Sequence, residues 1–217
     1  MAAKAQDGLH IQKWMCNITL LWTAASSAVR NLKRKVGMKM ALAEQKIYTV
    51  EDIYNLPEGQ RAELIDGNLY NMAPPTRQHQ QIILYLARKI SDYIDEKKGT
   101  CEVDLAPFAV FLNEDYKNYV EPDISVICDK NKLTDKGCNG APDWIIEVVS
   151  PGSQRMDCMI KLFKYRTAGV KEYWIVDPLK KLVTVYDFEQ DGFGEYSMSD
   201  IVKGNIFQDL HIDFSEI

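Results

Sequence analysis

The segment Asp143–Val149, with the sequence DWIIEVV, constrains the fold more than any other part of the chain. Such a short and nearly continuous apolar run is typical of a central strand that is buried on both faces of a sheet. Ser150 and Pro151 follow it directly, and serine at an N-cap with proline at the first helical position predicts the start of a helix. We expect this helix to run to about Ala168 and to end at Gly169. A buried strand followed by a helix favours a central sheet covered by helices.

The remaining hydrophobic pattern predicts further helices and strands. Residues 79–98 carry apolar side chains at three- and four-residue spacing, which is typical of a helix. Residues 61–72 roughly alternate between apolar and polar around Asp66-Gly67, a strong signal for a hairpin turn. The other expected elements are a short helix over Tyr48–Asn55 and strands over Cys101–Leu112, Tyr119–Cys128, Glu172–Val176 and Leu182–Phe188. This order predicts an α/β (mixed α+β) fold with a central mixed sheet flanked by helices and an N-terminal hairpin.

The charge of the chain is distributed unevenly. The 217 residues carry 26 basic and 31 acidic side chains, which gives a net charge of −5. Residues 1–40 hold seven of the basic side chains and one of the acidic ones, so they carry +6 and residues 41–217 carry −11. We therefore expect residues 1–40 to be an extension that is disordered or not part of the fold, and residues 41–217 to form one domain. The acidic charge argues against a protein that coats nucleic acid with its whole surface.

The extension contains an uncharged stretch, residues 14–29, that leaves three interpretations open. Its length is 16 residues, shorter than the roughly 20 that a membrane-spanning helix needs. We favour a translation start at Met38 or Met40, which makes the preceding residues dispensable. A disordered or peripheral helical arm and a targeting segment are the alternatives. We expect no association with a membrane.

The cysteines argue against a structural metal site. The five residues, at positions 16, 101, 128, 138 and 158, are odd in number and widely spaced. They form neither a CxxC pair nor the cysteine–histidine spacing of a zinc site. We therefore expect reduced thiols and a cytoplasmic protein.

Two acidic residues lie where burial of a carboxylate would be costly. Glu147 stands inside the apolar strand, and Asp123 opens the predicted strand DISVIC directly after Pro122. A buried carboxylate needs a compensating cation, and Mg²⁺ takes such carboxylate ligands when two of them enter neighbouring strands from the same edge. Glu63, in the hairpin strand AELI, is a third and weaker candidate. The alternative is that these acids are solvated or paired with Lys or Arg.

The helix after Glu147 supplies a candidate basic group. Asp157 and Lys161 lie four residues apart and share one face of that helix. They form either an ordinary ion pair on a solvated helix or a site in which Lys161 orients the attacking water or stabilises charge on a phosphoryl group. Three further residues are candidate substrate contacts: His79, Lys164 and Tyr165. For His79 and Tyr165 a structural role is the favoured alternative.

Four segments resemble, in this order, the motifs of a known family. They are AELIDGNLYNMAP, EPDISVICD, APDWIIEVVSP and DCMIKLFKYRTAGVKEYWIVDP. They are similar to the Uma-two family of "putative restriction endonucleases", which belongs to the PD-(D/E)XK nuclease superfamily, and the similarity runs from about Tyr48 to the C-terminus. The resemblance implies a restriction-endonuclease-like core and a Mg²⁺-dependent endonuclease that acts on DNA, with Mn²⁺ as a substitute metal. It leaves open a homodimer and, as the alternative function, a catalytically inactive binding or interaction module.

The resemblance also implies roles for individual residues. Asp123 matches the aspartate of the Pro-Asp motif, Glu147 the acid of the E-x-K motif, and Glu63 the upstream acid of the E-L-I-D-G segment. These three residues are therefore the expected metal ligands and, with a lysine, the expected catalytic residues.

The superfamily's lysine is missing from its usual place. Val149 stands two residues after Glu147, where the E-x-K motif has lysine. The D-x-x-x-K-x-x-x-Y pattern of the family falls on the next helix, at Asp157, Lys161 and Tyr165. We infer that Lys161 replaces the strand lysine from a position on the helix.

Overall fold

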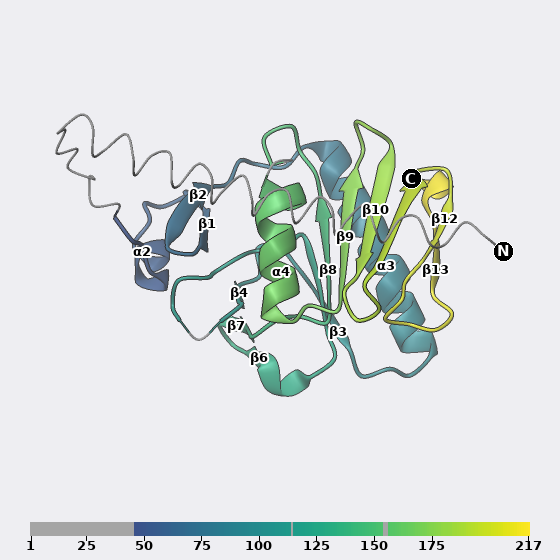
Figure 1. Ribbon diagram of the computed structural model, residues 1–217, viewed down its shortest axis with the longest axis horizontal. Helices are drawn as coiled ribbons and strands as arrows, with labels where there is room; N and C mark the ends of the chain where they lie inside the picture. The colour runs from purple at the N-terminus through teal and green to yellow at the C-terminus, as the bar shows by residue number, and fades with distance from the viewer. Residues whose placement is uncertain (1–45, 114, 154–155) are drawn as a thin grey trace, which may run out of the picture. The chain divides into compact units, whose positions relative to one another are not determined.

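The computed structural model describes residues 46–113, 115–153 and 156–217 (Figure 1). The expectations for residues 1–40, including the translation start and the three interpretations of residues 14–29, lie outside the described residues. Ile47–Ile217 form one compact unit. Within the described ranges, no helix is both long enough and apolar enough to cross a membrane.

A six-stranded sheet forms the centre of this unit. Its strands follow the order β11-β10-β9-β8-β5-β3, in which β8 pairs parallel with β9 and all other neighbours pair antiparallel. The predicted apolar strand is β8, and all five of its residues are buried. The bounds are β3 Glu102–Leu105, β5 Ile124–Ile127, β8 Trp144–Val148, β9 Glu172–Asp177, β10 Leu182–Asp187 and β11 Gly192–Ser197. This arrangement confirms the predicted mixed α+β fold with a central mixed sheet.

The two faces of the sheet are covered by different helices. On one face, buried Ile82, Leu86 and Ile90 of α3 (Arg77–Glu96) belong to the same apolar core as Trp144 and Ile146 of β8. On the other face, Ile145 packs in a second core with Tyr165 of α4 (Leu162–Ala168) and Tyr173 of β9. Alternate residues of β8 thus point to opposite faces, which explains why its sequence is apolar throughout.

In the connection between β8 and β9, the helix begins later than the sequence predicts. Residues 151–153 form a turn rather than the first turn of a helix, and in it the Ser150 N–H donates to Ser153 Oγ at 3.0 Å. A π-helical segment, Met156–Lys161, follows and continues into α4. The predicted end is confirmed, because Gly169 follows α4 with φ of 97°, a left-handed conformation that glycine adopts without strain.

Smaller elements surround the sheet. The predicted hairpin is confirmed as β1 (Ala62–Ile65) and β2 (Asn68–Asn71), with Asp66 and Gly67 both at positive φ. The predicted strand 101–112 is divided into β3 and β4, because Pro107 between them has no backbone N–H to donate. The other elements are α2 Val50–Tyr54, β4 Val110–Phe111, β6 Leu133–Thr134, β7 Gly137–Asn139, β12 Ile201–Lys203, β13 His211–Asp213 and short 3₁₀ turns at Lys130–Lys132 and Phe214–Glu216.

The expectation of reduced cysteines is wrong for one pair. Cys101 and Cys128 form a disulfide. They are neighbours because β3 pairs with β5 and Glu102 lies opposite Ile127, a contact that their separation of 27 residues in sequence hides. The cysteines therefore no longer support a cytoplasmic location.

Candidate active site

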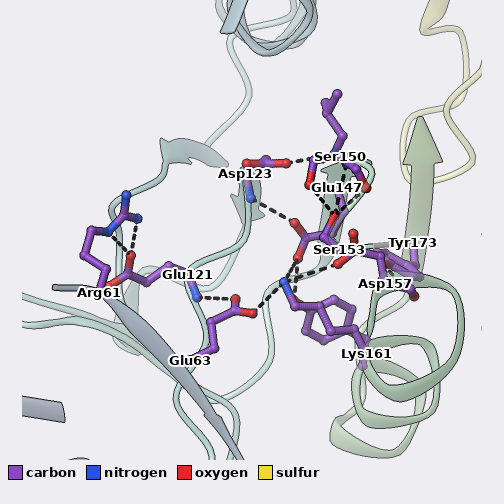
Figure 2. A network of polar contacts seen from close by, with 12 residues as sticks. Arg61, Glu63, Glu121, Asp123, Glu147, Ser150, Ser153, Asp157, Lys161 and Tyr173 are labelled. Atoms are coloured by element: carbon purple, nitrogen blue, oxygen red, sulfur yellow. Dashed lines mark hydrogen bonds and ion pairs between the residues drawn. The ribbon is translucent and has the colours of Figure 1, made fainter. Parts of the chain in front are cut away.

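The pairing of β5 with β8 brings Asp123 and Glu147 together. Ile124 lies opposite Ile146 in this antiparallel pair, so the residue before Ile124 faces the residue after Ile146. The backbone N–H of Asp123 donates to Glu147 Oε2 at 3.4 Å, and Asp123 Oδ2 accepts the N–H of Val148 at 2.8 Å. The two acids that the sequence places at one sheet edge are thus neighbours, joined by a hydrogen bond from the Asp123 backbone to the Glu147 carboxylate (Figure 2).

Glu63 reaches the same site from the hairpin. Its neighbour Leu64 forms an antiparallel bridge with Tyr119, which lays β1 beside the segment that leads into β5. Glu63 Oε1 accepts the N–H of Glu121 at 3.0 Å, and Oε2 lies 2.8 Å from Lys161 Nζ. Both oxygens of Glu63 are therefore engaged by groups of the protein.

Lys161 lies at the centre of the acidic cluster, as Figure 2 shows. Its Nζ lies 2.8 Å from Glu63, 2.9 Å from Glu147 and 3.5 Å from Asp157, and its side chain is only 5% exposed. Burial alone would lower the pKa of Lys161, but the three carboxylates outweigh it and raise the pKa well above its ordinary value. The raised pKa favours the ammonium form of Lys161, which contacts the acids, and the alternative of a solvated surface pair with Asp157 is wrong.

Glu147 has two strong donors on one oxygen. Lys161 Nζ at 2.9 Å and the Tyr165 hydroxyl at 2.7 Å both donate to Oε1. Burial raises the pKa of Glu147 well above its ordinary value, whereas the charge of Lys161 lowers it. The negative charges of Asp123, Asp157 and Glu63 also raise this pKa. Tyr165 is completely buried, so its contact is with Glu147 and no part of it is open to a substrate.

The other two named residues lie at the margin of the cluster. His79 Nε2 is 3.2 Å from Asp123 Oδ2, and its side chain is 12% exposed. Burial lowers the pKa of His79, but the hydrogen bond to Asp123 and the charge of that carboxylate raise it further, so the net shift is upward. Lys164 pairs with Asp66 at the hairpin turn.

Glu121 is a member of the network that the sequence analysis did not identify. Its carboxylate accepts the Tyr119 hydroxyl at 2.7 Å and pairs with Arg61, while its backbone N–H holds Glu63. Its position two residues before Asp123, in the same EPD motif, was the only available signal. Glu121 links the hairpin to the strand that carries Asp123.

The donor set suits a hard divalent cation held by few protein ligands. Among the side chains of the described residues, no group of three or more His, Cys, Asp and Glu is arranged to hold an ion as it stands. The backbone N–H of Asp123 contacts the Glu147 carboxylate, whereas the Glu63 carboxylate is engaged by Lys161 and by the N–H of Glu121. One or two carboxylates completed by water and substrate phosphates are the usual surroundings of Mg²⁺, so these residues fit that ion.

Comparison with known proteins places the chain in a family. The model of the family Uma2, described as "Putative restriction endonuclease", matches residues 50–213. An uncharacterized protein of Synechocystis sp., slr1290, is 25% identical over 134 residues, which cover 61% of this chain and 69% of that protein. A crystal structure of a "putative nuclease belonging to DUF820" from Anabaena variabilis has a TM-score of 0.64 and 21% identity, and the match covers 77% of this chain and 96% of that one. This chain therefore belongs to the Uma2 family of "putative restriction endonucleases".

Proposed function

We propose that this protein is a Mg²⁺-dependent endonuclease that hydrolyses phosphodiester bonds in DNA, with Mn²⁺ as an alternative metal. The observation that carries the proposal is the contact of 2.9 Å between Lys161 Nζ and Glu147 Oε1. This contact brings an ammonium group to Glu147, although Val149 stands where the E-x-K motif has its lysine. Asp123 lies beside Glu147. Family membership supports the same reaction.

Asp123 and Glu147 are the residues that would hold the metal ion, and Glu63 would contribute only through water or after leaving Lys161. When bound, a divalent cation supplies Lewis acidity toward the phosphate and makes a nearby water more acidic. The carboxylates of Asp123 and Glu147 would hold such an ion at the edge of the sheet, where a phosphate could meet it. Glu147 is buried, and this burial strengthens the charge interactions of its carboxylate.

Lys161 would stabilise the negative charge that develops on the phosphoryl oxygens or orient the attacking water. Its ammonium group is held by Glu63, Glu147 and Asp157, so it needs little reorganisation during the reaction. Tyr165 fixes the carboxylate of Glu147 by its hydrogen bond. Glu63 and Asp157 therefore act on the lysine, and the lysine acts on the substrate.

Binding of DNA would depend strongly on the metal. Lys164 and Arg166 of α4 are ion-paired with Asp66 and Asp191, which leaves little basic charge free on this helix for phosphates. The domain is also acidic, so it repels a polyanion at long range. We expect DNA affinity to rise when Mg²⁺ or Mn²⁺ is added to the metal-free protein.

One observation favours the second candidate, a nuclease-fold binding module without turnover. The ammonium group of Lys161 already compensates the acids that a cation would otherwise compensate. Metal titration separates the two functions, because a binding module should show no uptake of Mn²⁺ or Mg²⁺ that depends on Asp123.

Cleavage of plasmid DNA by a matched pair of variants tests the proposal. Glu147→Gln keeps the shape of the side chain but removes its charge, and we expect it to reduce metal-dependent cleavage by more than about 100-fold. Glu102→Gln is the control, because Glu102 is exposed on β3 and paired with Lys130. Unchanged cleavage by Glu147→Gln in a clean preparation would contradict the assignment.

A further inference from the structure

His79 is the side chain of the first turn of α3 that turns inward. The side chain of Thr76 caps this helix by accepting the N–H of His79 at 3.2 Å, which fixes the backbone at this point. The neighbours Gln78 and Gln80 are exposed, whereas the side chain of His79 is 12% exposed. The helix start therefore directs one imidazole toward the sheet edge that carries Asp123.

The imidazole and a backbone group hold the same oxygen of Asp123. His79 Nε2 lies 3.2 Å from Oδ2, and the Val148 N–H donates to Oδ2 at 2.8 Å. Because a carboxylate only accepts hydrogen bonds, His79 holds this oxygen in the forms of the imidazole that carry a proton on Nε2. Among the described residues, Oδ1 of Asp123 receives no hydrogen bond, and Nδ1 of His79 is buried without a partner.

We infer that His79 is a positioning residue for Asp123, whose Oδ2 it holds so that Oδ1 is left to bind the divalent cation. The inference rests on the proposed function. Carboxylates that bind metals are commonly oriented by such hydrogen bonds, and loss of the orienting group typically weakens metal affinity about 10–100-fold. His79 acts through Asp123 and does not itself contact the metal or the DNA.

Metal binding to the full-length protein without DNA tests this role directly. Dissociation constants for Mn²⁺ and Mg²⁺ are measured by titration calorimetry for the wild type, His79→Leu, His79→Gln and the control Gln80→Leu. We expect His79→Leu to raise both dissociation constants about 10–100-fold and by the same factor. His79→Gln should recover most of the affinity, because its amide N–H can donate to Asp123 Oδ2. Gln80→Leu, which changes an exposed residue of the same turn, should bind like the wild type.

Other outcomes identify other roles for His79. If His79→Leu binds the metal ions as tightly as the wild type, the inference is overturned. His79 is then a phosphate contact or has a purely structural role. A much larger loss for Mn²⁺ than for Mg²⁺, together with a nitrogen coupling in the electron paramagnetic resonance of bound Mn²⁺ that His79→Leu abolishes, also overturns it, because His79 is then a direct ligand. If His79→Gln does not recover metal affinity, and both variants lose thermal stability equally, the inference is overturned as well. His79 then acts in folding.

The test also separates this inference from the proposed function. If the wild type takes up metal and Asp123→Asn does not, the proposed metal site stands whatever His79→Leu does. If the wild type takes up neither Mn²⁺ nor Mg²⁺, the proposed function fails and the role of His79 fails with it.

Discussion

Replacement of Lys161 by methionine removes the ammonium group that, in the described structure, contacts three buried carboxylates. Methionine fills a similar volume, so the change isolates the charge. Glu63, Glu147 and Asp157 would then face one another without the group that now lies 2.8, 2.9 and 3.5 Å from them. All three side chains are at most 5% exposed, so water cannot replace the lysine.

The expected loss of stability at neutral pH is about 3–5 kcal/mol, the usual effect of removing one partner of a buried ion pair. The contacts with Glu63 and Glu147 should account for most of it, since Asp157 is farther away. Protonation of one or more carboxyl groups limits the loss, because a neutral acid is much cheaper to bury than a carboxylate.

The pH dependence of this loss has a definite sign. Burial raises the pKa of Glu147, and Lys161 is the cause that opposes the rise, so the variant should raise this pKa further. A group whose pKa is higher in the folded state stabilises the fold below its unfolded pKa, about 4.3 for glutamate, and this stability is lost as the pH rises through the folded pKa. The variant should therefore be closest to the wild type in acid and fall progressively below it toward pH 8.

Urea denaturation of the metal-free protein at pH 5 and pH 8 measures the effect. Lys97→Met is the matched control, because its ion pair with Asp209 is exposed and such pairs contribute little. An equal loss at both pH values, or a loss no larger than that of the control, would refute the argument that Lys161 compensates buried charge.

Three further predictions follow from single contacts of the structure. Tyr165→Phe removes the hydroxyl that lies 2.7 Å from Glu147 Oε1 and should cost about 1.5–3 kcal/mol in urea denaturation, with slower cleavage at saturating metal. Equal rates for this variant and the wild type would show that the hydroxyl does not position Glu147. Serine at both Cys101 and Cys128 should lower the free energy of unfolding by about 3 kcal/mol, because the disulfide closes a separation of 27 residues. No difference between this variant and the wild type under non-reducing conditions would mean that the disulfide does not form in solution. DNA binding measured by fluorescence anisotropy should strengthen on addition of Mn²⁺ in the wild type and remain unchanged in Asp123→Asn.

The part of the site that strands carry could be predicted from the sequence. Asp123 and Glu147 stand next to apolar strand residues, and the alternation of side chains along a strand determines which face of the sheet each of them lies on. Antiparallel pairing of β5 with β8 is then sufficient to bring them together. The hairpin turn at Asp66-Gly67 was predictable for the same reason, since its signal lies in adjacent residues.

The surroundings of Lys161 could not be predicted to the same extent. The helical pattern shows that Asp157 and Lys161 share a face, but whether that face meets water or the sheet depends on the turn at Ser150 and on the π-helical segment after it. The contact with Glu63 requires the bridge between Leu64 and Tyr119, which are far apart in sequence. Such long-range packing leaves no periodic signal.

Two other differences between the expected and the observed structure come from one long-range contact and one local contact. The disulfide depends on the register of β3 against β5, which spacing of the cysteines does not reveal. The expected helix start at Ser150-Pro151 is not observed, because residues 151–153 form a turn in which Ser150 bonds to the side chain of Ser153. In both cases a contact made in the folded chain overrides a pattern that is sound locally.

A crystal structure after soaking in Mn²⁺ tests the central claim most directly, because anomalous scattering locates the ion without assumptions. The account predicts one strong peak between a carboxylate oxygen of Asp123 and one of Glu147, with Lys161 Nζ still in contact with Glu63. A saturated crystal without a peak at these two residues, or with an ion only at other sites, would contradict it.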